Sequence, residues 1–150
     1  MQLVIEITRL VKTLHGGGHK VEILKKLNFE LSCPTIYDEA LYLLNRSGIK
    51  VSKEILDRDL SKTHKPNTSV MAAWKKIYQD PTKFWPLYEL AEKLTDFEDY
   101  FRRWRFNHVT TVERIIGFKR GTGGTSGTHY LRQMLDVELF PELWHVRTEL

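Results

Sequence analysis

His108 is the residue whose type and placement point most directly to chemistry. Trp104, His108 and Val112 follow one another at intervals of four, so a helix through them carries all three on one side. An imidazole can bind a metal through one ring nitrogen while the other donates a hydrogen bond. No second ligand residue lies four positions away on this stripe, which disfavours a zinc pair. A heme needs only one protein ligand and fits a solitary histidine; the alternative is a hydrogen-bonded core histidine.

A glycine-rich segment follows this helix. Residues 121–127 read Gly-Thr-Gly-Gly-Thr-Ser-Gly, with no Gly-Lys-Ser/Thr ending and no predicted strand before them. These two features exclude a Walker-type phosphate loop and a Rossmann fingerprint. Glycine permits positive φ and a close approach of backbone to ligand, and Thr122, Thr125 and Ser126 add hydroxyl groups. The segment is a candidate ligand-binding lid between two helices, with a merely mobile linker as the alternative.

The elements that must position these residues are predicted to be helices throughout. Apolar residues recur at intervals of three and four, and the longest such pattern follows Pro81 for about thirty residues, with an interruption allowed near Thr95 and Asp96. Its predicted inward stripe comprises Phe84, Leu87, Tyr88, Ala91, Leu94, Phe97, Phe101, Trp104, His108, Val112 and Ile115.

Shorter helices are predicted around the long one. Helices begin at Pro34 and Thr35, at the N-cap Ser52 and at the N-cap Ser69, and a last one begins near residues 127–130. Residues 2–14 favour a helix over a strand, and residues 21–29 a short helical segment. Their predicted inward residues are Ile36, Ala40, Leu43 and Leu44, then Ile55, Leu56 and Leu60, then Val70, Ala73, Trp74, Ile77 and Tyr78, and finally Leu131, Met134, Leu135 and Val137.

Length and composition set the outer bounds. The 150 residues suffice for one packed domain, and 17 aromatic side chains supply large core and pocket groups. A net charge of +4 is too mild to indicate nucleic acid. The single cysteine, Cys33, excludes an intrachain disulfide and favours a reducing compartment. No apolar run is long enough for a membrane span and no secretory signal is evident, so the expected location is the cytoplasm.

Both candidate features fall within a longer pattern that resembles the tryptophan 2,3-dioxygenase family. That family carries an Arg-x-x-His helix, a Val-Glu-Arg-Ile-Ile-Gly run, a Gly-Thr-Gly-Gly-Ser/Thr-Ser-Gly loop and a Tyr-Leu-Arg helix. This chain is similar at residues 84–94, 104–108, 112–117, 121–127, 130–132 and 139–148. The resemblance is close over residues 70–150 and loose over 30–69, and we expect residues 1–29 to be unmatched.

The resemblance implies an all-α heme-binding bundle of the tryptophan/indoleamine dioxygenase type, in one helical domain over residues 1–150. It implies that His108 is the proximal ligand of heme b. It also implies that Thr122 binds the substrate, with Gly121, Gly123 and Gly124 beside it. The reaction would add both atoms of O₂ across the indole C2–C3 bond of L-tryptophan to give N-formylkynurenine, the first step of tryptophan catabolism by the kynurenine pathway.

The chain departs from the family pattern in lacking the motifs of the N-terminal half. In the family that half supplies the distal histidine, distal aromatics and an arginine for the substrate carboxylate; His15 and His19 resemble none of these. The chain therefore corresponds to the C-terminal half of such an enzyme, and no catalytic residue is assigned. We expect exposed apolar faces, around Phe97 and Trp104, that lead to a homo-oligomer, a homotetramer by family habit, or to pairing with a complementary N-terminal half.

A second hypothesis belongs to a different class of protein. The same scaffold without heme would be a non-catalytic helical interaction module with a basic face for an acidic partner. That face would comprise Arg102, Arg103, Arg105, Arg114, Lys119 and Arg120. The remaining histidines, His64, His129 and His145, are predicted to lie at the surface.

Overall fold

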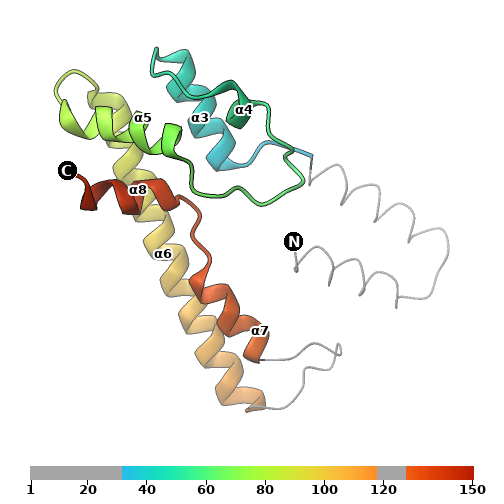
Figure 1. Cartoon of the computed structure of the whole chain (residues 1–150). Helices are drawn as coiled ribbons and strands as arrows, with labels where there is room; N and C mark the ends of the chain where they lie inside the picture. The colour runs from blue at the N-terminus through green and yellow to red at the C-terminus, as the bar shows by residue number, and fades with distance from the viewer. Residues whose placement is uncertain (1–31, 118–127) are drawn as a thin grey trace. The chain divides into compact units, whose positions relative to one another are not determined.

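The computed structural model describes residues 32–117 and 128–150, and all regular structure in them is helical (Figure 1). The all-α class is therefore confirmed. Contacts divide the chain into two compact units, Met1–Lys65 and Pro66–Leu150. The prediction of one domain over residues 1–150 stays a prediction. The helices expected over residues 2–14 and 21–29 lie outside the described residues.

In the first unit the main element is α3 (Ile36–Arg46). A capping box starts it: the Thr35 hydroxyl accepts from the Asp38 N–H, and the Asp38 carboxylate accepts from the Thr35 N–H at 2.8 Å. Gly48 ends it with φ +82°, and the Ile49 N–H reaches back to the Leu44 carbonyl at 3.0 Å. The predicted start of this helix at Pro34 and Thr35 is confirmed.

The buried face of α3 differs from the predicted one. Ile36 and Leu43 are 55% and 39% exposed, so their predicted inward placement is wrong. Ala40 and Leu44 are buried as predicted, and the helix also buries Tyr37 and Leu41, so that Tyr37, Leu41 and Leu44 follow one another at intervals of four and three. Ile36 precedes the first of these by one position, and one residue turns an α-helix by about 100°.

The short helix α4 (Lys53–Leu56) returns toward α3 and is shorter than predicted. Ser52 is its N-cap residue as expected. Ile55, Leu56 and Leu60 are only half-buried. The Tyr42 hydroxyl donates to the Leu56 carbonyl at 3.2 Å, which joins α3 and α4.

A buried ion pair fixes the segment after α4. Arg58 donates to both carboxylate oxygens of Asp38, at 2.6 and 2.8 Å, and to the Lys62 carbonyl at 2.6 Å. Asp38 is only 3% exposed. Burial by itself raises the pKa of Asp38, but the hydrogen bonds from Arg58 and Thr35 outweigh it and hold that pKa below its ordinary value.

In the second unit, α5 (Thr68–Gln79) packs against the long helix α6 (Trp85–Ile116). The predicted inward residues Val70, Ala73, Trp74 and Ile77 are buried, which confirms the helical stripe. The predicted N-cap Ser69 is wrong by two residues. Asn67 has extended backbone and its side-chain oxygen accepts from the Ser69 N–H at 2.8 Å, so Ser69 lies in the first turn.

Helix α6 is the longest helix that the structure describes in the second unit. Its 32 residues run without the interruption allowed near Thr95. The Thr95 hydroxyl is satisfied inside the helix, where it donates to the Ala91 carbonyl at 2.9 Å. Pro86 lies in its first turn, where a missing N–H costs no hydrogen bond. At 1.5 Å per residue the helix is about 48 Å long. Among the described residues, none of the helices combines the length and apolar character that crossing a bilayer requires.

The chain returns along α6 through α7 (Thr128–Gln133), η1 (Met134–Asp136), α8 (Pro141–His145) and η2 (Val146–Thr148) (Figure 1). The predicted last helix is therefore real but ends early, since an extended turn separates η1 from α8. Helix α7 contacts α6, whereas α8 contacts both α5 and α6.

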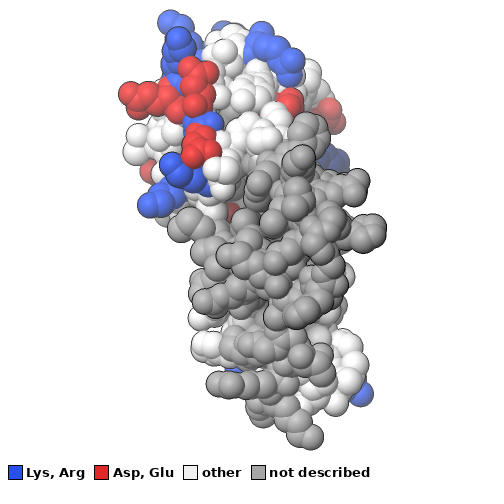
Figure 2. Space-filling view, turned by 90° about the vertical axis from the view of Figure 1, so that its right-hand side faces the viewer, with Lys and Arg blue, Asp and Glu red and all other residues white. Residues whose placement is uncertain are grey.

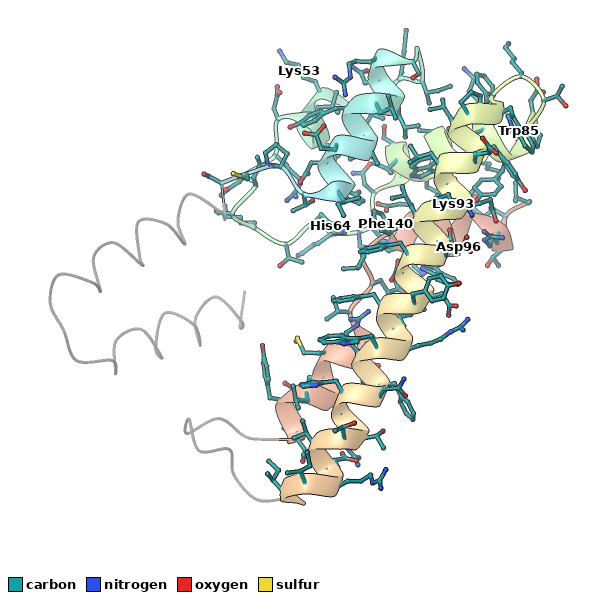
Figure 3. All side chains as sticks on the ribbon, turned by 180° about the vertical axis from the view of Figure 1, so that it is seen from behind. Lys53, His64, Trp85, Lys93, Asp96 and Phe140 are labelled. Atoms are coloured by element: carbon teal, nitrogen blue, oxygen red, sulfur yellow. The ribbon has the colours of Figure 1, made fainter. Side chains whose placement is uncertain are left out.

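A buried carboxylate joins the return segment to α6. Glu98 has no exposed surface and accepts from the backbone N–H groups of Leu139 and Phe140, each at 2.9 Å. Arg102 donates to the same carboxylate at 3.0 Å. Figure 3 shows Phe140 beside this part of α6, while Lys93 and Asp96 lie on its outer surface as an exposed ion pair.

We predict that Asp38 makes the first unit sensitive to acid. Because its folded pKa is lowered, its ionised form stabilises the fold fully above its unfolded pKa of about 3.9, and this contribution declines as the pH falls below that value. Protection factors of the α3 amides should therefore fall more between about pH 6 and about pH 3 in the parent chain than in Asp38→Asn. The exposed Asp57→Asn is the control and should follow the parent; parallel profiles for all three would contradict the prediction.

The Glu98 contacts predict a large cost for an almost isosteric change. Glu98→Gln places an amide NH₂ group against backbone N–H donors, so we expect a loss of about 2–4 kcal/mol in the free energy of unfolding of the second unit. Urea denaturation followed by circular dichroism measures it. Glu89→Gln on the exposed side of the same helix should change it by less than about 0.5 kcal/mol. Equal losses in the free energy of unfolding for the two variants would show that the hydrogen bonds of Glu98 contribute nothing to stability.

Candidate functional site

The C-terminal half of α6 has two distinct faces. Glu98, Arg105 and Val109 are buried against the return segment. The predicted inward stripe lies about a quarter-turn away and is exposed: Phe97 is 44%, Trp104 is 57% and Ile115 is 75% exposed. Within the described residues, the predicted inward placement is therefore right for Leu87, Ala91 and Leu94 and wrong for the part of the stripe from Phe97 onward. The expectation of exposed apolar faces around Phe97 and Trp104 agrees with this exposure.

Four rings on the exposed face form a stack, which we call the aromatic ladder: Phe97, Phe101, Trp104 and His108. Ring centroids of successive members are 6.2, 5.5 and 5.4 Å apart. Their planes are parallel to within 9° at every step. These spacings are those of favourable aromatic pairs, so the ladder is an ordered surface rather than a set of unrelated exposed rings.

His108 lies at the C-terminal end of the ladder and is exposed. The alternative interpretation, that His108 is a hydrogen-bonded residue of the core, is therefore wrong. Two threonines after it, Thr110 and Thr111, donate to the carbonyls four residues earlier, at 3.0 and 2.8 Å, so their hydroxyls are satisfied along the helix. Within residues 32–117 and 128–150, no group of three or more His, Cys, Asp or Glu side chains is arranged to hold a metal ion.

Arg105 supports the ladder from the buried side. It is 7% exposed and donates to the Met134 carbonyl at 2.5 Å, while its guanidinium lies 5.1 Å from the Phe101 ring centroid. Burial lowers the pKa of Arg105, and the nearby carboxylate of Glu98 opposes that effect. The side chain therefore connects the ladder to the return segment, a role that helical spacing alone does not reveal.

The described residues contradict the basic face of the second hypothesis only in part. Arg105 is buried, so its predicted place on that face is wrong. Arg102 is paired with Glu98 and Glu138 and lies 4.4 Å over the Trp144 ring, and Arg103 is paired with Asp99. On the face drawn in Figure 2, basic and acidic side chains of the described residues are interspersed. Arg114 is exposed, and Lys119 and Arg120 lie outside the described residues.

The predicted substrate residues Gly121, Thr122, Gly123 and Gly124 also lie outside the described residues, but both flanks of their segment are described. Helix α6 ends at Gly117, whose φ of +63° favours glycine, and α7 begins at Thr128, which is buried. Arg132 of α7 donates to Glu113 of α6 at 2.7 Å. Residues 118–127 therefore join two helices that are fastened to each other close to His108.

The structure also places the other three histidines for which the sequence predicted a surface position. His129 and His145 are exposed as predicted. His64 is half-buried and stacks on Tyr37, with ring centroids 3.8 Å apart, so its assignment as a plain surface residue is wrong. The sequence offered no signal for that pair, because the two rings are 27 positions apart.

Comparison of the chain with known proteins identifies its family. The model of the tryptophan 2,3-dioxygenase family matches residues 75–150, which include α6, the glycine segment and the return segment. The chain belongs to the tryptophan 2,3-dioxygenase family, which is a family of oxidoreductases.

Individual relatives agree with that assignment. The chain is 61% identical over 135 residues to a tryptophan 2,3-dioxygenase of Bradyrhizobium diazoefficiens, covering 90% of this chain and 48% of the relative. It is 54% identical over 140 residues to one of Burkholderia ambifaria, covering 93% and 46%, and 56% identical over 142 residues to one of Bradyrhizobium sp. strain ORS 278, covering 95% and 51%. The chain thus spans about half the length of the curated relatives it matches.

The extent of the match corrects one expectation. An alignment of 142 residues leaves at most eight of the 150 outside it, so most of residues 1–29 must be matched. The prediction that this segment is unmatched is wrong. Short motifs identify the parts of a family with distinctive spacing, whereas a full alignment also detects a segment whose likeness is spread over many positions.

The two faces of α6 predict losses of unequal size on truncation. Leu94→Ala removes a buried side chain and should lower the free energy of unfolding of the second unit by about 2–4 kcal/mol. Phe97→Ala removes a larger but half-exposed ring and should cost less than about 1 kcal/mol in the isolated chain. Urea denaturation of both variants measures this, and a larger loss for Phe97→Ala would show that the ladder is core.

Proposed function

We propose that this chain forms the heme-ligating and substrate-covering part of a tryptophan 2,3-dioxygenase, with His108 as the protein ligand of heme b. The reaction is the addition of both atoms of O₂ across the indole C2–C3 bond of L-tryptophan, which gives N-formylkynurenine and requires no external reductant. The observation that carries this proposal is the placement of His108: exposed, at the end of an aromatic face, on a rigid helix of a chain in this family.

The residues present fit a heme. A porphyrin is flat and apolar over most of its area, and the ladder offers exposed rings along the same side of α6 as the imidazole. One histidine suffices as the protein's ligand, so a cluster of ligand residues is not needed. When bound, the heme supplies the dioxygen chemistry of the reaction, and the protein supplies ligand, orientation and exclusion of water.

The residues of this chain have separable tasks in that proposal. His108 binds as a neutral imidazole through one ring nitrogen. Residues 121–127 close over the amino acid, where Thr122 hydrogen-bonds to its polar groups and the glycines allow backbone N–H groups to approach. The helices on either side of this segment are joined by the hydrogen bond from Arg132 to Glu113.

Assembly follows from the exposed ladder. An apolar aromatic face of this kind on one helix marks an interaction surface. In the proposal the heme covers its end at His108, and the rest is covered in a homo-oligomer or by a complementary half that carries the distal pocket.

The test is a titration of the purified chain with hemin, followed by L-tryptophan. The parent chain should give one Soret transition per chain, His108→Ala should lose it, and the exposed His129→Ala should keep it. Thr122→Ala should keep the transition but need about five- to tenfold more L-tryptophan for half-maximal perturbation of the band, as for one lost hydrogen bond. A Soret band that His108→Ala retains would refute the ligand, and an unchanged tryptophan response in Thr122→Ala would refute the substrate contact.

A further inference from the structure

The last step of the aromatic ladder concerns the imidazole itself. The Trp104 and His108 rings lie 5.4 Å apart between centroids with planes 6° apart. Trp104 is stacked on its other side by Phe101 at 5.5 Å and 9°. The indole is therefore held between a phenyl ring and the imidazole, and it shares its plane orientation with both.

The opposite end of this stack is fastened to the buried side of the helix. Arg105 lies over the Phe101 ring and is fixed by its hydrogen bond to the Met134 carbonyl. The order Met134, Arg105, Phe101, Trp104, His108 thus links the return segment to the imidazole through one hydrogen bond and a series of stacked groups. Each member restricts the rotamers of the next, because a parallel stack is lost when either ring rotates about χ2.

Among the described residues, none makes a hydrogen bond with the His108 ring. A ligating imidazole is usually oriented by a hydrogen bond to its second nitrogen. The lone pair of the ligating nitrogen lies in the ring plane, so whatever fixes the plane also fixes the direction in which that nitrogen can bind.

We propose that Trp104 is a positioning residue for His108: stacking on the indole holds the imidazole plane, and hence the lone pair of its ligating nitrogen, before any ligand binds. The inference rests on the proposed function in taking His108 as the ligand of heme iron. It assigns to Trp104 a task that is not core packing, since more than half of this side chain is exposed.

Three variants separate positioning from bulk. Trp104→Phe keeps a flat ring that can stack on His108, and Trp104→Leu keeps apolar bulk without a plane. Phe106→Leu is the matched control, because Phe106 is an exposed aromatic residue two positions from His108 and is not part of the ladder. All three should retain the helical content of the parent chain by circular dichroism.

The first readout needs no heme. In the chain labelled at histidine, the His108 ring protons should show upfield NMR shifts caused by the indole ring current. Those shifts should be retained in part in Trp104→Phe, should move to values of free histidine in Trp104→Leu and should be unchanged in Phe106→Leu. Identical His108 shifts in the parent and in Trp104→Leu would overturn the stack.

The second readout uses hemin as the probe. Loss of one stacking pair predicts about three- to tenfold weaker hemin binding by Trp104→Leu, with Trp104→Phe within about twofold of the parent. In the reduced complex the iron–histidine stretching band should broaden in Trp104→Leu only. Parent-like affinity and band in Trp104→Leu, with binding still lost in His108→Ala, would overturn the positioning role and leave the proposed function standing. Unchanged binding by His108→Ala would instead refute the proposed function, whatever the NMR shifts show.

Discussion

The fully buried Glu98 carboxylate is the constraint on which the second unit depends. It accepts from the N–H groups of two consecutive residues, Leu139 and Phe140, and so fixes the point at which the return segment meets α6. From there α8 can contact both α5 and α6, while η1 and α7 also contact α6. Charge-assisted hydrogen bonds to a backbone are both strong and directional, so this side chain holds the return segment against the face of α6 that carries Glu98.

The second half of α6 reverses the usual arrangement of an amphipathic helix, because charged side chains are buried and aromatic side chains are exposed. Glu98 and Arg105 are buried in the second half of α6, whereas Phe97 and Trp104 are exposed. A soluble helix ordinarily buries its apolar stripe, and an exposed aromatic face marks a surface that binds something. The chain spans about half the length of its relatives in the tryptophan 2,3-dioxygenase family. In the function proposed above, this open face is the one that carries the heme ligand His108.

Sequence reasoning succeeded where the information is local. Intervals of three and four located α5 and α6, and the capping pattern at Thr35 located the start of α3. It failed where the answer depends on a distant partner: periodicity shows that Phe97 and His108 share a face, but not what covers that face. The burial of Arg105 depends on a carbonyl 29 positions later, and no spacing rule contains that contact. Residues 121–127 were recognised by family motif, and their placement stays a prediction.

The two parts proposed to carry the chemistry are close in sequence and share one scaffold. His108 is on α6, the glycine segment leaves the end of the same helix, and α7 is fastened back to it through Arg132 and Glu113. Arg105, three residues before His108 on α6, makes a second connection to the return segment through its hydrogen bond to the Met134 carbonyl. The spacing between the imidazole and the flanks of the glycine segment is thus set inside the second unit, by helix geometry and two side-chain contacts. Whatever completes the site has to adapt to that spacing, because a packed helix pair bends far less readily than a loop.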